Sequence, residues 1–262
     1  MVTKIKVTEK KPIKLYMVGD IHLGSITCAE KALDQTIEMI KKDPQARVIL
    51  MGDQGDYIFP DDTRRYDPAC NSVFPSATTT TAALYKKFKP IRKKIMGVLR
   101  GNHEATYAKT HLEEYEGMAV RDEAEVLAVM LDVQYLEDMG VIKLKLGKAD
   151  YTIVAMHGIN CSSTVSSQIN KLSKLSDIFE TTPHLVAMGH VHSLQTILNP
   201  KLTYDFKTKL KHVALTGNYF KTYIEGNMNY ASGQLYGALP VGCVMYEFDG
   251  KGNIKDNKII FD

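Results

Sequence analysis

Metal-binding residue types follow five short apolar stretches of this 262-residue chain. Each stretch leads through a glycine or a sharp turn into Asp, Asn or His, which are common ligands of divalent metals. Five of the eight histidines lie in these clusters, so the pattern predicts a shared metal site. The clusters are Asp20/His22, Asp53/Asp56, Asn102/His103, His157 and His190/His192.

Asp53 is predicted to lie at the centre of this site. Residues 48–51 read as a short buried strand that stops at Gly52, after which Asp53 and, three residues later, Asp56 follow. Two carboxylates at a strand tip are costly to place together unless a positive charge lies between them. We therefore expect Asp53 at the middle of a two-metal site whose other ligands come from the remaining clusters.

Each cluster taken alone has an ordinary explanation. Asp53 could end a turn or cap a helix, Asn102 could be a loop residue, and His157 could be a hydrogen-bonded core histidine. Five separate strand ends that all carry Asp, Asn or His are hard to explain by capping. Ligands of open α/β sheets bind at the carboxyl ends of strands, which is where all five clusters are predicted.

The elements that must position these residues follow from hydrophobic periodicity. Strands are predicted over Ile13–Val18 and Arg47–Met51, on either side of a helix over Ala29–Lys42. This is a β-α-β unit, so its two strands are expected to be parallel. Further strands that lead into clusters are predicted over Ile95–Leu99, Tyr151–Met156 and Leu185–Met188.

The rest of the chain completes a mixed pattern. Residues 1–11 alternate and predict an edge strand, and a helical composition extends over Ala105–Leu131 with a break near Gly117. The part after His192 is predicted to be largely antiparallel, with one strand over Tyr219–Ile224. Additional helices are predicted over Thr79–Phe88 and Ser163–Asp177.

Composition bounds the class of protein. A hydrophobic content of 44% over 262 residues suits a single domain spanning 1–262. The net charge of +3 is too weak to indicate nucleic-acid binding by itself. The four scattered cysteines predict free thiols in a reducing compartment. No signal peptide and no membrane span are expected, which indicates a cytoplasmic protein.

The ordered blocks resemble a known superfamily. Gly-Asp-x-His, Gly-Asp-x-x-Asp, Gly-Asn-His-Glu, a single His and Gly-His-x-His occur in this order from Gly19 to His192. This set is similar to that of the calcineurin-like metallophosphoesterases. The resemblance implies an α/β fold, a four-layer α-β-β-α sandwich of mixed sheets with the metal site at the carboxyl ends of the strands.

The resemblance also implies a dinuclear site. Asp20, His22, Asp53 and His192 would hold one divalent metal, and Asp53, Asn102, His157 and His190 would hold the other. Manganese is the favoured metal, with iron, zinc or cobalt as alternatives, because the ligands are mixed oxygen and nitrogen without thiolate. A metal-bridging hydroxide would attack phosphorus.

His103 is implied to act on the substrate and not on the metals. It would protonate or stabilise the leaving oxygen, while Asp56 orients it and favours its imidazolium form. The alternative is that Asp56 only caps a turn. Glu104 is expected simply to begin a helix, where a carboxylate is favourable, and Cys161 to be a small buried thiol.

Five further residues are candidates for substrate binding. Tyr219 and Lys221 follow a segment where relatives line the pocket. Arg64 and Arg65 lie in an irregular excursion over Tyr57–Ala77, which reaches to about residue 90 with the predicted helix. These arginines, and Arg100, could contact a phosphate or a nucleic-acid backbone, or could be solvated charges.

The sequence favours a phosphodiesterase or nuclease that acts on DNA, RNA or nucleotides. Gly19–Gly24 is similar to the opening motif of DNA-repair exonucleases, although the extra histidine of that branch does not occur from Asp56 to Asn102. Leu99–Glu104 is similar to serine/threonine phosphatases, but Gly52–Tyr57 departs from their second block. The alternatives are a phosphomonoesterase or, although no ligand is missing, a non-catalytic scaffold. The chain most resembles small phage and bacterial members of the superfamily that carry such an excursion. No membrane partner is expected. The oligomeric state is left open.

Overall fold

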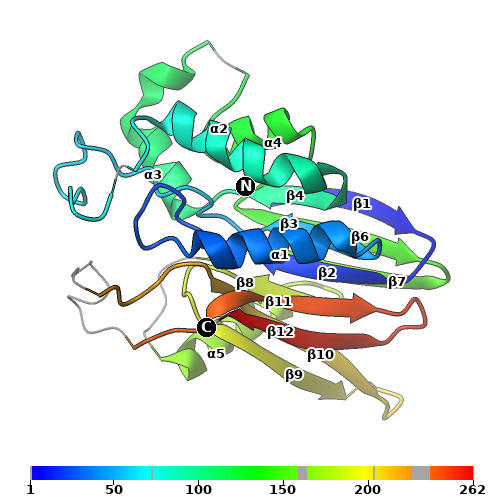
Figure 1. The fold of residues 1–262 in the computed structure, drawn as a ribbon. Helices are drawn as coiled ribbons and strands as arrows, with labels where there is room; N and C mark the ends of the chain where they lie inside the picture. Colours follow the sequence, from blue (N-terminus) through cyan, green and yellow to red (C-terminus); the bar gives the residue numbers. More distant parts are fainter. Residues whose placement is uncertain are drawn as a thin grey trace.

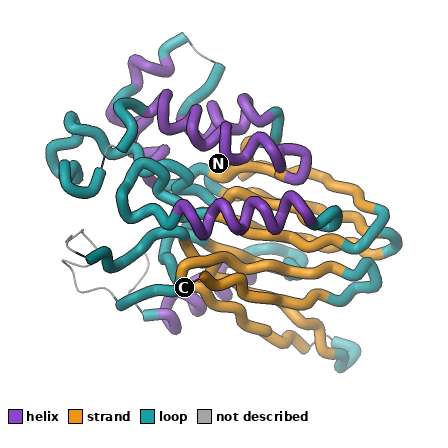
Figure 2. The backbone as a smooth tube through the Cα atoms, viewed as in Figure 1, coloured by secondary structure: helices purple, strands orange, loops and turns teal. Residues whose placement is uncertain are grey.

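The computed structural model describes residues 2–71, 73–117, 119–158, 164–202, 204–225 and 237–261. Its strands form one continuous sheet that folds over into two halves facing one another, called the first and the second sheet below, with helices on both outer faces (Figures 1 and 2). This is the predicted four-layer α-β-β-α arrangement. No helix in the described part of the chain combines the length and apolar character that crossing a bilayer requires.

The first sheet has the strand order β12-β11-β2-β3-β4-β5. Its central strands β2, β3 and β4 are parallel, as the β-α-β prediction required. The outer strands β11 and β12 are antiparallel to their neighbours. The strands comprise β2 (Ile13–Val18), β3 (Ala46–Leu50), β4 (Ile95–Leu99), β5 (Tyr135–Glu137), β11 (Val241–Phe248) and β12 (Ile254–Phe261).

The second sheet has the strand order β1-β6-β7-β8-β10-β9. It meets the first sheet on both sides, through the pair Val2/Glu137 of β1 and β5 and through a short pairing of β10 with β11. The pairings therefore run as a closed ring around the sandwich. The strands comprise β1 (Val2–Glu9), β6 (Met139–Leu146), β7 (Ala149–Met156), β8 (Leu185–Met188), β9 (Leu194–Leu202) and β10 (Thr208–Asn218).

Side-chain alternation along the strands builds three apolar layers. In β3, Val48 and Leu50 pack toward the helices of the first sheet, whereas Ile49 and the following Met51 pack between the two sheets. Helices α1 (Glu30–Lys42), α2 (Ala77–Phe88) and α4 (Glu123–Leu131) cover the first sheet, and α5 (Val165–Asp177) covers the second (Figure 1). Both faces of β3 are thus buried, which explains its continuous apolar run.

One sequence-based expectation is wrong, and two hold in modified form. The N-terminal strand β1 pairs with β6 along its whole length, but on its other side, within the described residues, it meets β5 only through Val2 and Glu137, so most of it is an edge as expected. Alternation reveals which face of a strand is buried but not how many neighbours it has. The break expected near Gly117 is present, because the helical stretch Ala105–Leu131 is divided into α3 (Asn102–Thr110), a 3₁₀ turn (Leu112–Tyr115) and α4. Asp122 starts α4 afresh because its side chain accepts a hydrogen bond from Glu125 N at 2.9 Å.

The expectation that is wrong concerns Tyr219–Ile224, which is not a strand. Gly217 has a φ of +84°, and the Asn218 side chain accepts a hydrogen bond from Phe220 N at 2.7 Å. These features turn the chain out of β10, and the segment retains isolated bridges such as that between Phe220 and Cys28. Residues Cys161 and Ser163 lie outside the described residues.

Candidate metal centre

The strand register brings the five clusters to one end of the sandwich. Val18 of β2 pairs with Leu50 of β3, and Met156 of β7 pairs with Met188 of β8. Parallel strands in register end together, so the loops that follow them are neighbours. Beyond the β2/β3 pair, Asp20 N still donates to the Gly52 carbonyl at 3.0 Å.

One group of candidate ligands combines the loops after β2 and β8. The Nε2 atoms of His22 and His192 lie 3.3 Å apart. His192 Nε2 is also 3.3 Å from Asp20 Oδ1. Asp20 is fully buried, and both of its carboxylate oxygens lie 3.0 Å from His190 N, which donates to them. One carboxylate and two imidazoles thus converge within reach of a single ion.

A second group combines the loops after β3, β4, β7 and β8. Ligand atoms of Asp53, His157 and His190 lie within 4.8 Å of one another. His157 Nε2 is 3.3 Å from Asp53 Oδ2 and 2.9 Å from Asn102 Oδ1. The opposite ring nitrogen, Nδ1, lies 2.9 Å from the Met51 carbonyl, which fixes the orientation of the ring.

Asp53 connects the two groups. Its Oδ2 atom is 3.3 Å from His157 Nε2 and 3.9 Å from His22 Nε2. Its Oδ1 atom accepts a hydrogen bond from His103 N at 2.9 Å. Asp53 is 1% exposed, so contacts with the protein, and not with solvent, set the orientation of its carboxylate.

The backbone of the site is strained in a way that short polar residues tolerate. Asp20, His22, Asp53, His190 and His192 all have φ values between 48° and 66°, in the left-handed region. Asp and His enter this region more readily than most other residues. Such conformations persist only where the surrounding structure enforces them, and they cluster at functional sites.

Charge interactions keep the carboxylates ionised. Burial opposes ionisation, but the imidazoles of His157 and His103 hold the pKa of Asp53 well below its usual range. Burial likewise opposes ionisation of Asp20, whose pKa His192 lowers. For His157, burial lowers the pKa, yet the Asp53 carboxylate outweighs it and raises the pKa to about 10.

The residues present fit divalent metal ions. Asp53 Oδ2 and Asn102 Oδ1 lie within 3.3 Å of His157 Nε2, and the three atoms face a common position where a cation would be held. His22 and His192 point equivalent nitrogen atoms at one another. Buried carboxylates and imidazoles that face a common centre are the donor set of N/O-ligated divalent metals. The structure therefore brings together all seven predicted ligands.

His103 lies beside this set, in the first turn of α3. Its Nδ1 atom hydrogen bonds to the Asp56 carbonyl and lies 3.7 Å from Asp56 Oδ1. Its ring packs edge-on to that of His22, with centroids 4.6 Å apart. One atom of His103 also falls within a possible ligand group with His22 and Asp53. Geometry alone thus leaves His103 as a substrate group or an additional ligand.

The predicted substrate-binding residues are placed differently. The Arg100 side chain donates to Asp138 at 3.0 and 2.5 Å and lies 3.5 Å from Asp122. Arg65 is paired with Asp62, with Nε 2.6 Å from Oδ2. These arginines are engaged by carboxylates.

The other three candidates differ among themselves. Tyr219 is fully buried, and its hydroxyl lies 2.8 Å from Thr36 Oγ1, so its side chain enters the helix-side core. Arg64 and Lys221 have exposed side chains.

Sequence reasoning missed two supporting residues. Glu104 does begin a helix, but its buried carboxylate also accepts hydrogen bonds from the backbone N–H groups of Gly101, Asp53 and Gln54 at 3.0, 3.2 and 2.8 Å. Phe220 packs against both His22 and His192, with ring centroids 5.4 Å away in each case. The Glu104 contacts depend on a distant loop, and no local signal predicts them.

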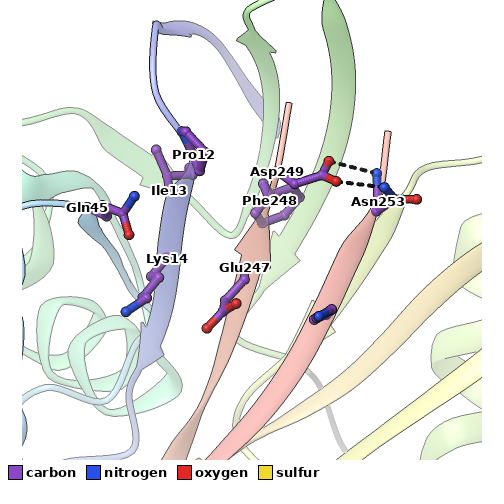
Figure 3. Close-up of a pocket in the computed structure, with 9 residues that line it drawn as sticks. Pro12, Ile13, Lys14, Gln45, Glu247, Phe248, Asp249 and Asn253 are labelled. Carbon is purple, nitrogen blue, oxygen red and sulfur yellow. Dashed lines mark hydrogen bonds between the residues drawn. The ribbon is translucent and has the colours of Figure 1, made fainter. Parts of the chain in front are cut away.

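A separate cavity of about 180 Å³ lies at the other end of β2. Figure 3 shows its lining, where Asp249 accepts hydrogen bonds from Asn253. Lys14 there lies 3.0 Å from Asp43. We assign no function to this cavity.

Comparison with known proteins identifies the family. The sequence model of the calcineurin-like phosphoesterases matches residues 13–217, which include every candidate ligand. The chain belongs to this family, and it is a metal-dependent phosphoesterase. No curated protein sequence is significantly similar to the chain.

Solved structures resemble the chain at low identity. A predicted phosphoesterase from Streptococcus pneumoniae is 13% identical, with a TM-score of 0.40, over 96% of this chain and 100% of that one. NAD nucleotidase from Haemophilus influenzae is 10% identical, with a TM-score of 0.42, over 96% of this chain and 50% of that one. The nuclease MPE from Pseudomonas putida is 13% identical, with a TM-score of 0.35, over 93% and 87%. At these values we take no substrate from them.

Proposed function

We propose that this chain hydrolyses phosphodiesters of nucleic acids or nucleotides with two divalent metal ions. The observation that carries the proposal is the position of Asp53, whose Oδ2 atom faces an imidazole of each ligand group, at 3.3 and 3.9 Å. A carboxylate shared in this way suits a pair of ions that it bridges. Two ions would supply Lewis-acid charge and a nucleophile of lowered pKa at neutral pH.

The ligands divide between the two ions by their loops. Residues Asp20, His22 and His192, with Asp53, would hold one ion. Asn102, His157 and His190, with Asp53, would hold the other. Their mixed nitrogen and oxygen donors favour manganese, iron, zinc or cobalt over magnesium alone, and we propose manganese.

His103 would manage the leaving group. Its Nδ1 atom is held by Asp56, which leaves Nε2 to carry a proton toward the substrate. The backbone N–H of His103 is fixed by Asp53 Oδ1, so the ring is anchored at both its main chain and its Nδ1 side. A positioned imidazole can protonate an alkoxide as the bond to phosphorus breaks.

Two exposed cations support a diester substrate of extended shape. Arg64 lies in the excursion between β3 and α2, and Lys221 lies in the segment after β10. Both segments project from the same end of the sandwich (Figure 1). Basic side chains in two segments at the end of the sandwich that carries the metal site suit a polyanionic chain better than a small monoester.

A substrate panel with Mn²⁺ tests the proposal. The purified chain is assayed against bis(4-nitrophenyl) phosphate, 4-nitrophenyl phosphate, single-stranded DNA and double-stranded DNA, with and without EDTA. We expect hydrolysis of the diester and of DNA that EDTA abolishes and Mn²⁺ restores. Activity on the monoester alone would replace the diesterase proposal with a phosphomonoesterase, and no activity on any substrate would favour a non-catalytic scaffold.

A further inference from the structure

The end of the excursion is fastened to the loop that follows the first motif. The Cys70 carbonyl accepts hydrogen bonds from Ile26 N at 3.0 Å and from Ser25 Oγ at 3.2 Å. Val73 N donates to the Gly24 carbonyl at 2.9 Å. This part of the excursion is therefore a fixed neighbour of the metal site and not only a surface loop.

Asn71 reaches from this segment to Asp56. Its Nδ2 atom donates to Asp56 Oδ2 at 2.6 Å, and its Oδ1 atom accepts from Asp67 N at 2.9 Å. A backbone N–H can only donate and a carboxylate can only accept. These two partners therefore identify the Nδ2 and Oδ1 atoms of the Asn71 amide. Asn71 N also donates to the Asp67 carbonyl at 2.8 Å, which closes a turn and holds the side chain in place.

The second oxygen of Asp56 lies between two histidines. Asp56 Oδ1 is 3.5 Å from His22 Nδ1 and 3.7 Å from His103 Nδ1. His22 Nδ1 is buried and makes no hydrogen bond within the described part of the chain, so Asp56 is the acidic group that it faces. A carboxylate is rigid and planar, so the bond that fixes Oδ2 also fixes the direction of Oδ1.

We propose that Asn71 is a positioning residue for the active site. By holding Asp56 Oδ2, it directs Oδ1 at the Nδ1 side of both His22 and His103. The opposite ring nitrogen of His22, Nε2, then points to the metal group. The Nε2 atom of His103 points to the leaving group. The inference rests on the proposed function for the roles of these two histidines, and it adds a residue that lies outside every metal-ligand motif.

The test replaces the donor without changing its shape. Asn71→Asp keeps an acceptor for Asp67 N but turns a second carboxylate toward Asp56, which repels it. Asn253→Asp is the matched control, because Asn253 Nδ2 donates to Asp249 Oδ2 at the same distance of 2.6 Å, beside the separate cavity. Asn71→Ala removes the donor without adding charge.

The first readout needs no catalysis. Histidine ring ¹⁵N resonances are recorded for the full chain, without metal and with Zn²⁺. We expect the His22 and His103 signals to shift in both Asn71 variants, while the His184 and His212 signals stay in place. Asn253→Asp is expected to shift neither His22 nor His103. Unchanged His22 and His103 resonances in a folded Asn71→Asp protein would overturn the inference, whatever reaction the chain catalyses.

The second readout is the dependence of rate on the leaving group. With Mn²⁺, Asn71→Asp is expected to lower kcat about 10–100-fold for a diester with a poor leaving group. The loss should be smaller for bis(4-nitrophenyl) phosphate, whose leaving group needs little protonation, and KM should change less than kcat. An equal loss on both substrates, in proportion to lost metal or lost folded protein, would reduce Asn71 to a structural residue and contradict the proposal. Absence of activity in the unmodified chain would instead count against the proposed function.

Discussion

The two oxygens of Asp53 have separate tasks. Oδ1 accepts the backbone N–H of His103, and Oδ2 faces the imidazoles of His22 and His157. The Asp53 backbone N–H is in turn held by Glu104. The carboxylate is thus oriented by the protein before any ion binds, which reduces the reorganisation that metal binding requires.

Replacement of His103 by alanine separates its two conceivable roles. If the imidazole serves the leaving group, His103→Ala should retain the metal content of the unmodified protein. Turnover should fall by roughly 10²–10⁴-fold, most for poor leaving groups, because the lost contribution is that of a general acid. Metal analysis and rates on activated and unactivated diesters measure both quantities. Loss of a bound ion from the variant would show that His103 is a ligand.

The turn between β4 and α3 joins three parts of the site within four residues. Glu104 closes it by accepting N–H groups from Gly101 and from the loop after β3. Asn102 and His103 then project from the first helical turn toward His157 and Asp56. A helix that begins at this point therefore positions both a proposed metal ligand and the proposed substrate group.

Position 101 in this turn has no space for a side chain, so only glycine fits there. A Cβ atom there would lie 2.1 Å from both the backbone nitrogen and Oδ1 of Asp53. Gly101→Ala must therefore displace Asp53, and we expect the free energy of unfolding to fall by about 1–3 kcal/mol. We also expect more than a tenfold loss of Mn²⁺ affinity, a loss at least as large as that for an outer-shell partner.

Denaturant unfolding and calorimetric Mn²⁺ titration measure these effects. Gly237→Ala is the control, since a Cβ atom there meets no atom of the described residues within 4 Å. Gly101→Ala protein with the stability and the Mn²⁺ affinity of this control would contradict the crowding argument.

The local sequence pattern predicted the strands that end at the site. The directions of several side chains depend instead on contacts between segments that are far apart in the sequence. The strand before Asp53 and the parallel β2/β3 pair followed from apolar runs and a β-α-β order. The direction of the Tyr219 side chain could not be predicted in this way, because it depends on Thr36 of α1. The backbone donors that reach Glu104 and the bond from Asn71 to Asp56 likewise join segments far apart in sequence.

The two sheets are linked on both sides, through β1 with β5 and through β10 with β11. We propose that the described elements form one domain that unfolds as a unit. Candidate ligands come from both sheets, so the site exists only when the sheets are packed together. Loss of the sandwich should therefore release the metals in the same transition.

Alkaline pH should weaken this sandwich. Burial raises the pKa of the Cys243 thiol to about 12, and burial with the Asp43 charge raises that of Tyr16 to about 12. In the unfolded chain these groups ionise near about 8.5 and 10. Between those values and pH 12 the folded state binds more protons, so the free energy of unfolding falls as pH rises, by up to about 1.4 kcal/mol per pH unit for each group.

Urea unfolding between pH 8 and pH 11 measures the slope. The stabilising contribution of Cys243 should be complete below pH 8.5 and decline above it. Cys243→Ala should therefore show a shallower decline than the unmodified chain. Equal slopes for the two proteins would mean that this thiol does not ionise on unfolding in that range.

The number of Mn²⁺ ions bound per chain tests the shared-carboxylate site most directly. Metal-free protein is equilibrated with Mn²⁺, separated from free ions and analysed for metal, beside Asp53→Asn and a control, Asp249→Asn, at the remote cavity. We expect two ions in the unmodified chain and in the control, and fewer than two in Asp53→Asn, because one carboxylate serves both ions. A single ion in the unmodified chain, or two ions in Asp53→Asn, would contradict the site described above.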